Sequence, residues 1–401
     1  MELYLQFGWG MMEHCRVLLS SWGGGTVILS PRDLEPTQLP SFATSITRIP
    51  DSEVLLDPQF YLPDSDHGRL CSHTYWPAEY QTGLFWQGTQ LNTLLAGLLQ
   101  LNRQCGCSAF ILPGRLAATV DDDWLNIQQM TLEAARMLDT ELPLISTIAL
   151  SSDATRTENQ IIDLLECAAE WDADGYYIVC EHPNGSYLVE DASWLANITD
   201  LVAGLRLRGA HIIVGYCNHQ MLIAASAGAN AIASGTWMNV RSFSSDKFRT
   251  SNEDEIRQKA KWYYCPQALS EYRLPMLDMA RTQGLLEQMV PVPEMDSGQV
   301  AALFSGVQPT TVPFSEKAAF RHYLHSLYRQ VQLARAASFD ETAQRHDELL
   351  NVAEALLNTL TGSRITGQLR DFSEIVAINR VVLGSLITRR GAMLRRNWNN
   401  L

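Results

Sequence analysis

Two carboxylates stand directly after apolar segments of strand length, and these residues are the best placed to do chemistry. Asp57 follows Val-Leu-Leu, and Glu181 follows Tyr-Tyr-Ile-Val-Cys. Apolar walls shift the pKa of a carboxyl group, so two such groups can take different pKa values and serve as acid and base. We therefore predict Asp57 and Glu181 as a catalytic pair. The competing interpretations are a turn residue before Pro58 and an ion pair of Glu181 with Arg115 or Arg241.

Positively charged, aromatic and polar side chains follow other predicted strands. A guanidinium group at such a place can hold a phosphate or a carboxylate with two hydrogen bonds, and an aromatic face can stack on a nucleobase or a sugar. Residues 61–86 are rich in aromatic side chains, and they either cover the site as a binding loop or pin themselves to the fold. The predicted substrate-binding residues are Tyr61, Arg115, His219, Trp237, Asn239 and Arg241.

The sequence gives no specific signal for a metal or a cofactor. Eight cysteines are scattered, and no cluster of Cys and His has the spacing of zinc ligands. His182 and His219 could join a carboxylate around a metal, and Cys217 could pair with His219 as a nucleophile, but the spacing requires neither. No G-x-G-x-x-G motif follows the first predicted strand, which removes the main signal of a dinucleotide fold. We predict neither a cofactor nor a metal.

Apolar segments of strand length alternate with amphipathic segments of helix length from the N-terminus to about residue 245. This alternation predicts parallel strands joined by helical crossovers, and eight such units fit a closed barrel better than an open sheet. In such a barrel the strand ends named above meet at one face, where active sites lie. The predicted strands are Leu3–Gly8, Thr26–Ser30, Val54–Asp57, Ala109–Pro113, Leu144–Leu150, Tyr176–Cys180, His211–Gly215 and Ala231–Ser234.

The predicted fold is α/β, a (β/α)8 TIM-type barrel followed by an α-helical C-terminal domain. Residues 1–290 form the barrel, residues 291–313 a proline-rich linker, and residues 314–401 the helical domain. Further helices are expected around Asn252–Lys261 and Pro275–Met289. In the last domain, apolar residues recur at helical spacing over three long segments. These segments are about Ser315–Ala337, Asp340–Thr361 and Gln368–Asn397.

The composition is that of an ordinary globular chain, with 401 residues, 46% of them hydrophobic, and a formal net charge of −14. Such a charge does not suit nonspecific nucleic-acid binding over the whole surface. Residues 364–401 differ, because they hold seven arginines against two acidic residues. This basic end is either a solvated helix face or a contact surface for nucleic acid or a protein partner. The apolar runs are too short to span a bilayer, and the first residues lack the features of a signal peptide, so we expect a cytoplasmic protein with no membrane partner.

The placement of several of these residues resembles that in the tRNA-guanine transglycosylase-like barrels, including those that exchange a base in DNA. The similar features are a third strand that ends in Asp57 followed by Phe60, Val214-Gly215 at the seventh strand, and Arg241 after the eighth. That family exchanges a base at an N-glycosidic bond with two aspartates. The resemblance implies Asp57 as the first aspartate and a nucleobase- or nucleoside-type pocket. Ser234-Gly235 stands where the second aspartate is expected.

Two functions therefore compete. The first is a barrel enzyme whose carboxylate pair performs acid–base chemistry on a glycosidic or nucleobase-like substrate, as a transglycosylase does. The second is a non-catalytic barrel subunit of a multiprotein or nucleic-acid-associated complex, docked through its helical C-terminal domain. Polar residues at nearly every strand end favour the enzyme, and the missing second aspartate favours the subunit.

Overall fold

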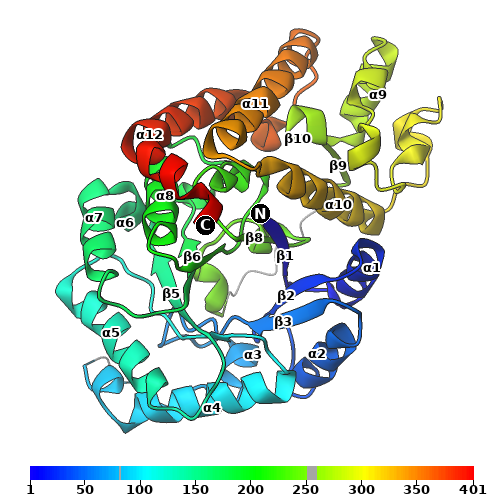
Figure 1. The fold of residues 1–401 in the computed structure, drawn as a ribbon. Helices are drawn as coiled ribbons and strands as arrows, with labels where there is room; N and C mark the ends of the chain where they lie inside the picture. The colour runs from blue at the N-terminus through cyan, green and yellow to red at the C-terminus, as the bar shows by residue number, and fades with distance from the viewer. Residues whose placement is uncertain (81–82, 251–259) are drawn as a thin grey trace.

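The computed structural model describes residues 1–80, 83–250 and 260–401, and its centre is a barrel of eight parallel strands (Figure 1). The strand order is β3-β2-β1-β8-β7-β6-β5-β4, and the amide of Ser108 donates to the carbonyl of Val54 at 3.1 Å where β4 approaches β3. The predicted (β/α)8 barrel is confirmed. Its strands are β1 Glu2–Gln6, β2 Gly25–Leu29, β3 Ser52–Leu56, β4 Phe110–Ile111, β5 Leu144–Leu150, β6 Gly175–Cys180, β7 His211–Val214 and β8 Ala231–Ser234.

The last strand, β8, joins β1, with Leu3 opposite Ile232 in the register. The chain leaves β8 through Gly235, where a Cβ atom would stand only 2.5 Å from the carbonyl oxygen of Gln6. So close an approach between two backbone segments requires glycine. It allows the residues that follow, 236–241, to leave the barrel and reach the C-terminal part of the chain.

Eight α-helices accompany these strands in the described chain and cover the outside of the barrel (Figure 1). Two of them begin with the same motif, Asp-x-x-Trp. The carboxylate of Asp121 accepts a hydrogen bond from the amide of Trp124 at 2.9 Å, and Asp191 caps its helix through Trp194 at 3.0 Å. The indole N–H of Trp194 also donates to the carbonyl of Glu181 at 3.0 Å, so the motif fixes the end of the preceding strand. The helices are α1 Met12–Trp22, α2 Leu39–Thr47, α3 Gly68–Cys71, α4 Thr89–Cys105, α5 Asp122–Arg136, α6 Ser152–Arg156, α7 Glu158–Cys167 and α8 Ala192–Arg206.

The chain from residue 262 onward forms a β-hairpin and four further α-helices. The three long helices predicted from apolar spacing are confirmed as α10, α11 and α12, whereas the hairpin was not predicted. The helix predicted around Asn252–Lys261 falls almost entirely outside the described residues, and the one predicted over Pro275–Met289 is α9 followed by a short 3-10 helix. The elements are β9 Trp262–Cys265, β10 Ser270–Arg273, α9 Leu274–Thr282, α10 Glu316–Ala334, α11 Phe339–Gly362 and α12 Ser373–Asn397.

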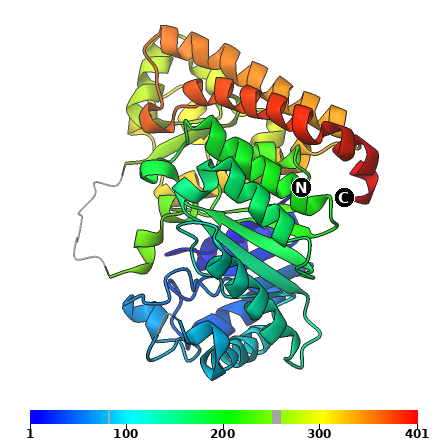
Figure 2. The same ribbon diagram turned by 90° about the vertical axis from the view of Figure 1, so that its left-hand side faces the viewer.

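The C-terminal helices pack directly on the barrel. Figure 2 shows α11 and α12 side by side along one flank, where α12 packs on α8, and α10 packs on β1. On this side the described connections that follow β7 and β8 are short 3-10 helices, so the C-terminal helices cover strands that lack a long helix of their own. The three short helices are η3 His219–Ala225, η4 Met238–Val240 and η5 Ser245–Phe248.

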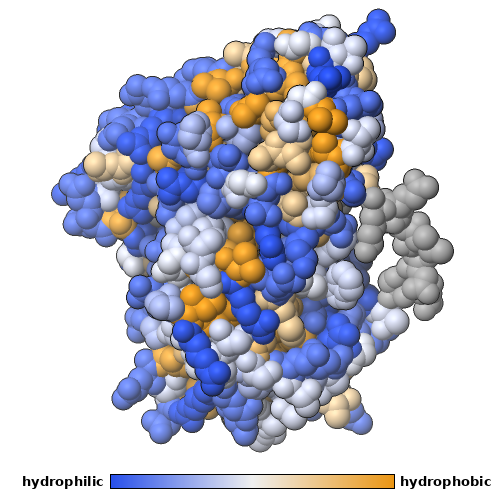
Figure 3. All heavy atoms as spheres, turned by 90° about the vertical axis from the view of Figure 1, so that its right-hand side faces the viewer, coloured by the Kyte–Doolittle hydropathy of each residue, from blue (hydrophilic) through white to orange (hydrophobic). Residues whose placement is uncertain are grey.

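No helix in the described part of the chain is long and apolar enough to cross a membrane. On the face that carries α1, α9 and α10, hydrophobic side chains lie in separate groups among hydrophilic ones (Figure 3).

Candidate functional site

Asp57 directly follows β3 and is fully buried in the mouth of the barrel. Its carboxylate accepts hydrogen bonds from the backbone amide of Gln59 at 2.9 Å and from the hydroxyl groups of Tyr61 at 2.8 Å and Tyr216 at 2.9 Å. The hydroxyl of Tyr177, from β6, lies 3.3 Å from Oδ2. We name these five residues the Asp57 cluster. It contains Tyr61, whose predicted role in substrate binding stays a prediction.

One hydroxyl group of the Asp57 cluster has two acceptors within reach. The Tyr177 hydroxyl lies 2.9 Å from Oε1 of Gln6 and 3.3 Å from Oδ2 of Asp57. A phenol has one proton to donate, so when Tyr177 donates to Gln6, its oxygen can accept a hydrogen bond from the protonated form of Asp57. The cluster therefore accommodates both the carboxylate and the carboxylic acid form of Asp57.

The protonation of Asp57 is set by burial among uncharged groups. Burial raises the pKa of Asp57 to about 6, although hydrogen bonds from Gln59, Tyr61, Tyr216 and Tyr177 lower it in part. All of these donors are uncharged, so they do not overcome the lost hydration of the carboxylate. A carboxyl group with a pKa near 6 exchanges its proton close to neutral pH, as an acid or base catalyst must.

Two phenylalanines cover the Asp57 cluster. The rings of Phe243 and Phe248 lie 4.9 and 5.0 Å from the ring of Tyr61, and Phe243 lies 5.2 Å from Tyr216, measured between centroids. Both belong to residues 242–248, which we name the cover segment. Asp57 is fully buried, and the cover segment packs on two of the tyrosines that hold its carboxylate.

Glu181 holds the cover segment in place. Its Oε1 accepts hydrogen bonds from the amide of Ser245 at 3.0 Å and from the hydroxyl of Ser245 at 2.7 Å. On the other side of the segment, Nε of Arg32 donates to the carbonyl of Lys247 at 2.6 Å. The described contacts thus connect Glu181 to the Asp57 cluster through the cover segment.

The arginines predicted near Glu181 have other partners. Arg115 pairs with Asp123 at 3.0 Å, and Arg241 pairs with Glu271 at 3.3 Å. The described contacts place Arg115 outside the Asp57 cluster, and it also does not line the pocket described next. Its role in substrate binding stays a prediction.

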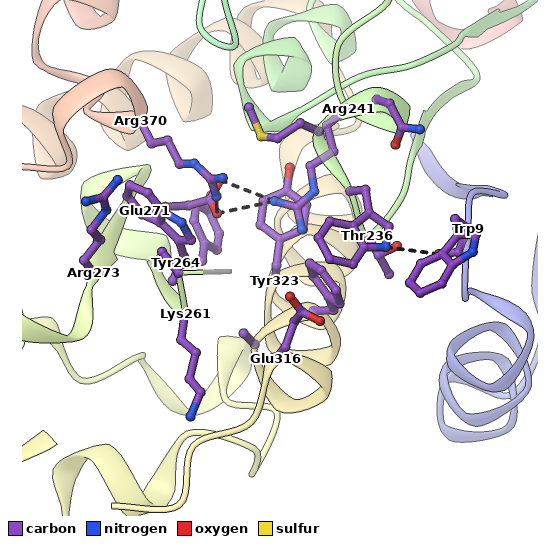
Figure 4. Close-up of a pocket in the computed structure, with 17 residues that line it drawn as sticks. Trp9, Thr236, Arg241, Lys261, Tyr264, Glu271, Arg273, Glu316, Tyr323 and Arg370 are labelled. Carbon is purple, nitrogen blue, oxygen red and sulfur yellow. Dashed lines mark hydrogen bonds and ion pairs between the residues drawn. The ribbon is translucent and has the colours of Figure 1, made fainter. Parts of the chain in front are cut away.

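A second site lies where the C-terminal part of the chain meets the barrel (Figure 4). It is a pocket of about 960 Å³ between the loop after β1, the segment after β8, the β9–β10 hairpin, α10 and Arg370. Three predicted substrate-binding residues, Trp237, Asn239 and Arg241, line this junction pocket together. Its wall consists of Trp9, Thr236, Trp237, Met238, Asn239, Arg241, Ala260, Lys261, Trp262, Tyr264, Glu271, Arg273, Glu316, Ala319, Phe320, Tyr323 and Arg370.

Arginines from the barrel and from the C-terminal part meet at one buried carboxylate. Nη1 of Arg241 lies 3.3 Å from Oε1 of Glu271, and Nη1 of Arg370 lies 2.6 Å from Oε2 (Figure 4). The Tyr187 hydroxyl donates to Oε1 at 2.7 Å. Burial acts to raise the pKa of Glu271, but Arg370 and Arg241 outweigh it and lower the pKa to about 2. Glu271 is therefore a permanent negative charge shared by two arginines.

Aromatic rings of the junction pocket lie against its guanidinium groups. The Arg241 guanidinium carbon is 3.4 Å from the ring centre of Tyr323. Those of Arg370 and Arg273 are 4.0 and 5.0 Å from the ring of Trp262. Such cation–π contacts favour flat stacking arrangements of charged and aromatic groups.

His219 lies behind the junction pocket. It is fully buried, and its ring packs 5.0 Å from Tyr264 and 6.1 Å from Tyr323, both of which line the pocket. Burial lowers the pKa of His219 to about 4, so the imidazole is neutral near pH 7. In this arrangement it supports the pocket wall without lining the pocket itself.

Sequence reasoning missed most of the residues that complete these two sites. Tyr216 follows a predicted strand directly and so meets the strand-end rule, but it was not among the predicted site residues. Tyr177 lies inside a strand, while Glu271 and Arg370 lie outside the predicted barrel units and carry no local signal. Across the described residues, no group of three or more His, Cys, Asp or Glu side chains is arranged to hold a metal ion.

The basic end at residues 364–401 is largely neutralised within the chain. Arg390 binds Asp200 through two hydrogen bonds of 2.8 and 2.9 Å and so attaches α12 to α8. Four other arginines of this end also pair with acidic residues, which lowers the positive charge available to a partner. They are Arg370 with Glu271, Arg380 with Glu354, Arg389 with Glu158 and Arg395 with Asp340.

Comparison with known proteins adds no family assignment. No protein-family model matches the chain, and no curated protein matches its sequence. The two sites are therefore interpreted from their own chemistry.

Proposed function

We propose that this barrel is an enzyme in which Asp57 performs acid–base chemistry on a glycosidic or nucleobase-like substrate. The observation that carries the proposal is the buried carboxyl group at a strand end, held by uncharged donors. Its burial raises the pKa of Asp57 to about 6. General acid–base catalysis needs a group of this kind and contributes roughly 10²- to 10⁴-fold to a rate. The resemblance to tRNA-guanine transglycosylase-like barrels points to the same residue as the first aspartate.

The proposed reaction begins when the cover segment moves away. Phe243 and Phe248 then leave the aromatic rings of Tyr61 and Tyr216, and a flat substrate base can take their place. Asp57 in its acid form donates a proton to the leaving nitrogen of the base, and the glycosyl carbon forms its new bond to water or to an incoming base. The proton that this nucleophile loses later returns to Asp57. The hydroxyl groups of the cluster then stabilise the carboxylate that remains.

Glu181 has a positioning role in this proposal. It holds Ser245, and thereby the cover segment, in the closed arrangement. The predicted pair of carboxylates is thus divided between one group that exchanges a proton and one that controls access. The docking alternative receives less support, because the arginines of residues 364–401 are mostly paired within the chain.

The test is a screen for base release or base exchange on nucleosides, nucleotides and short oligonucleotides, with free labelled bases as acceptors. For any substrate that reacts, we expect the rate to change with a pKa near 6, and Asp57→Asn to lower the rate about 100-fold or more. Asp163→Asn is the matched control, because this side chain is exposed on α7. A folded Asp57→Asn protein with the full rate would contradict the proposal.

A further inference from the structure

We infer that the junction pocket is a binding site for a nucleoside phosphate, a planar aromatic base that carries a phosphate group. The pocket shares no wall residue with the Asp57 cluster. The inference goes beyond the acid–base function proposed above and does not depend on it.

The first argument is local charge. The chain carries a net charge of −14, yet the wall of the junction pocket holds more cationic than acidic side chains. The acidic ones are Glu271 and Glu316, and the cationic ones are Arg241, Lys261, Arg273 and Arg370. A positive concavity on an otherwise acidic molecule attracts anions.

The second argument is that two arginines of the pocket wall share a single carboxylate. Arg241, which is 2% exposed, and Arg370 both pair with Glu271, and neither has another acidic partner in the described chain. A phosphate would balance the surplus positive charge and would match the donor geometry of a guanidinium group.

The third argument is a pair of unpartnered polar atoms in the same wall. The hydroxyl of Thr236 and Oδ1 of Asn239 are buried, and neither has a hydrogen-bond partner among the described residues. Thr236 as a whole is 2% exposed. Buried polar groups are nearly always hydrogen-bonded, so these atoms indicate a ligand that offers a donor and an acceptor.

The fourth argument is the aromatic wall, which explains why the ligand carries a base. Trp262 lies under the guanidinium groups of Arg370 and Arg273, and Trp237 packs 4.9 Å from Phe320. A nucleobase can extend such a stack from its pocket-facing side. The volume of about 960 Å³ lies within the range of small-molecule sites.

A purely structural latch between the barrel and the C-terminal part explains only some of these features. A latch requires ion pairs such as Arg241 with Glu271, and it is most stable when the numbers of cationic and acidic groups are equal. It gives no reason for the surplus cation or for the unpartnered atoms of Thr236 and Asn239.

The experiment is a titration of the full chain with candidate ligands, in which binding is measured by calorimetry and by tryptophan fluorescence. The ligands are purine nucleoside 5′-monophosphates, the matching nucleosides, inorganic phosphate and a short single-stranded oligonucleotide. We expect the monophosphate to bind at least ~10-fold more tightly than the nucleoside or phosphate alone, and its affinity to fall as salt is added.

Two variants locate the site. Arg273→Gln removes an exposed cation that forms no ion pair among the described residues, and we expect the affinity for the monophosphate to fall ~10-fold. Arg345→Gln is the matched control, because Arg345 is an exposed arginine on α11, away from the pocket. Thr236→Val should weaken binding while the unliganded protein keeps or gains thermal stability, since it removes a buried hydroxyl without a partner.

The titrations of these variants either support or overturn the inference. Loss of affinity in Arg273→Gln and Thr236→Val but not in Arg345→Gln supports the inference. It is overturned if no monophosphate binds the folded chain, if phosphate alone binds as tightly, or if only the oligonucleotide binds, which would indicate a nucleic-acid surface. A Thr236→Val protein that loses stability and binds normally would assign a structural role to the pocket wall.

Discussion

Asp57 lies in the mouth of the barrel and Glu271 lies at its junction with the C-terminal part. Both carboxyl groups are buried, yet their pKa values move in opposite directions. The donors around Asp57 are a backbone amide and tyrosine hydroxyls, and the pKa of Asp57 rises to about 6. Glu271 contacts Arg241 and Arg370, and its pKa falls to about 2. Burial is the largest influence on both groups, so the charge of the partners decides the outcome.

The difference separates two kinds of site. The Asp57 cluster can gain or lose a proton near neutral pH, which suits a reaction. Glu271 stays charged and acts as the counter-ion of two arginines at the edge of a binding pocket. The first site is closed by the cover segment at residues 242–248, and the second is built only when the barrel and the C-terminal part meet.

The largest effect is expected at Glu271. Glu271→Gln leaves two arginines without their only acidic partner in the described chain, and we expect a loss of about 3–5 kcal/mol in the free energy of unfolding, measured with urea. The exposed pair of Glu341 with Arg345 provides the control, and Glu341→Gln should cost about 0.5 kcal/mol. Equal losses in the two variants would show that Glu271 is no more desolvated than a surface residue.

The second prediction concerns the pH dependence that Asp57 confers. Because its folded-state pKa of about 6 lies above the reference value of 3.8, the folded chain binds more protons between these values than the unfolded chain does. Stability from this group is therefore present at low pH and is lost as pH rises from about 4 to 6, by on the order of 3 kcal/mol.

Asp57→Asn isolates this contribution. The stability of the variant relative to the native chain should improve between pH 4 and pH 7, whereas the difference for Asp163→Asn should change little. Buried histidines impose the opposite slope on both proteins, since burial lowers the pKa of His322 and of His346 to about 4, and the comparison removes their effect. A constant difference for Asp57→Asn would contradict the raised pKa.

The sequence predicts the closed site better than the junction pocket. An apolar run followed directly by Asp57 is a local signal, and the barrel rule places the strand end at the mouth. The inward direction of Tyr177 could not be predicted, because β6 is buried on both faces and its sequence does not alternate. The sequence thus predicts the carboxylate of the cluster but not the hydroxyl groups that influence the pKa of Asp57.

The junction pocket depends on a hairpin that has almost no turn signal. Between β9 and β10 the chain passes through Leu269 with a φ of 48°, a left-handed conformation in which glycine or asparagine is expected. Without that signal, neither Trp262 nor Glu271 could be placed beside the eighth strand. Trp237, Asn239 and Arg241 were predicted to face a ligand, but their partners were not, since these come from distant parts of the chain.

The third prediction tests whether the hydroxyl groups act on the charge of Asp57. Tyr61→Phe removes a donor to the carboxylate and should cost about 1–2 kcal/mol of stability, with a larger loss at pH 8 than at pH 5 because the charged form needs the donor more. Tyr75→Phe is the matched control, since the buried hydroxyl of Tyr75 donates to the carbonyl of Pro58 at 2.8 Å. The loss of stability in Tyr75→Phe should be the same at both pH values. Equal pH dependence in the two variants would contradict the claim that the cluster hydroxyl groups stabilise the charged form of Asp57.

The smallest effect is expected where Glu181 holds the cover segment. Ser245→Ala removes the hydroxyl hydrogen bond of 2.7 Å and leaves the amide hydrogen bond in place, so we expect local opening to become easier by about 1 kcal/mol. Amide hydrogen exchange within residues 242–248 should then speed up about five-fold, while global stability changes little. Ser41→Ala, at an exposed serine of α2, is the control and should leave this exchange unchanged.

The same variant separates the two sites, because the junction pocket does not include Ser245 or Glu181. Faster exchange in the cover segment, together with unchanged nucleoside phosphate affinity, would show that access to Asp57 and binding at the junction pocket are controlled independently. If the affinity at the junction pocket changes as well, the two sites are coupled. Lys247 is then the first residue to examine, because its ammonium group donates to the carbonyl of Asn239, which lines the pocket, at 3.3 Å.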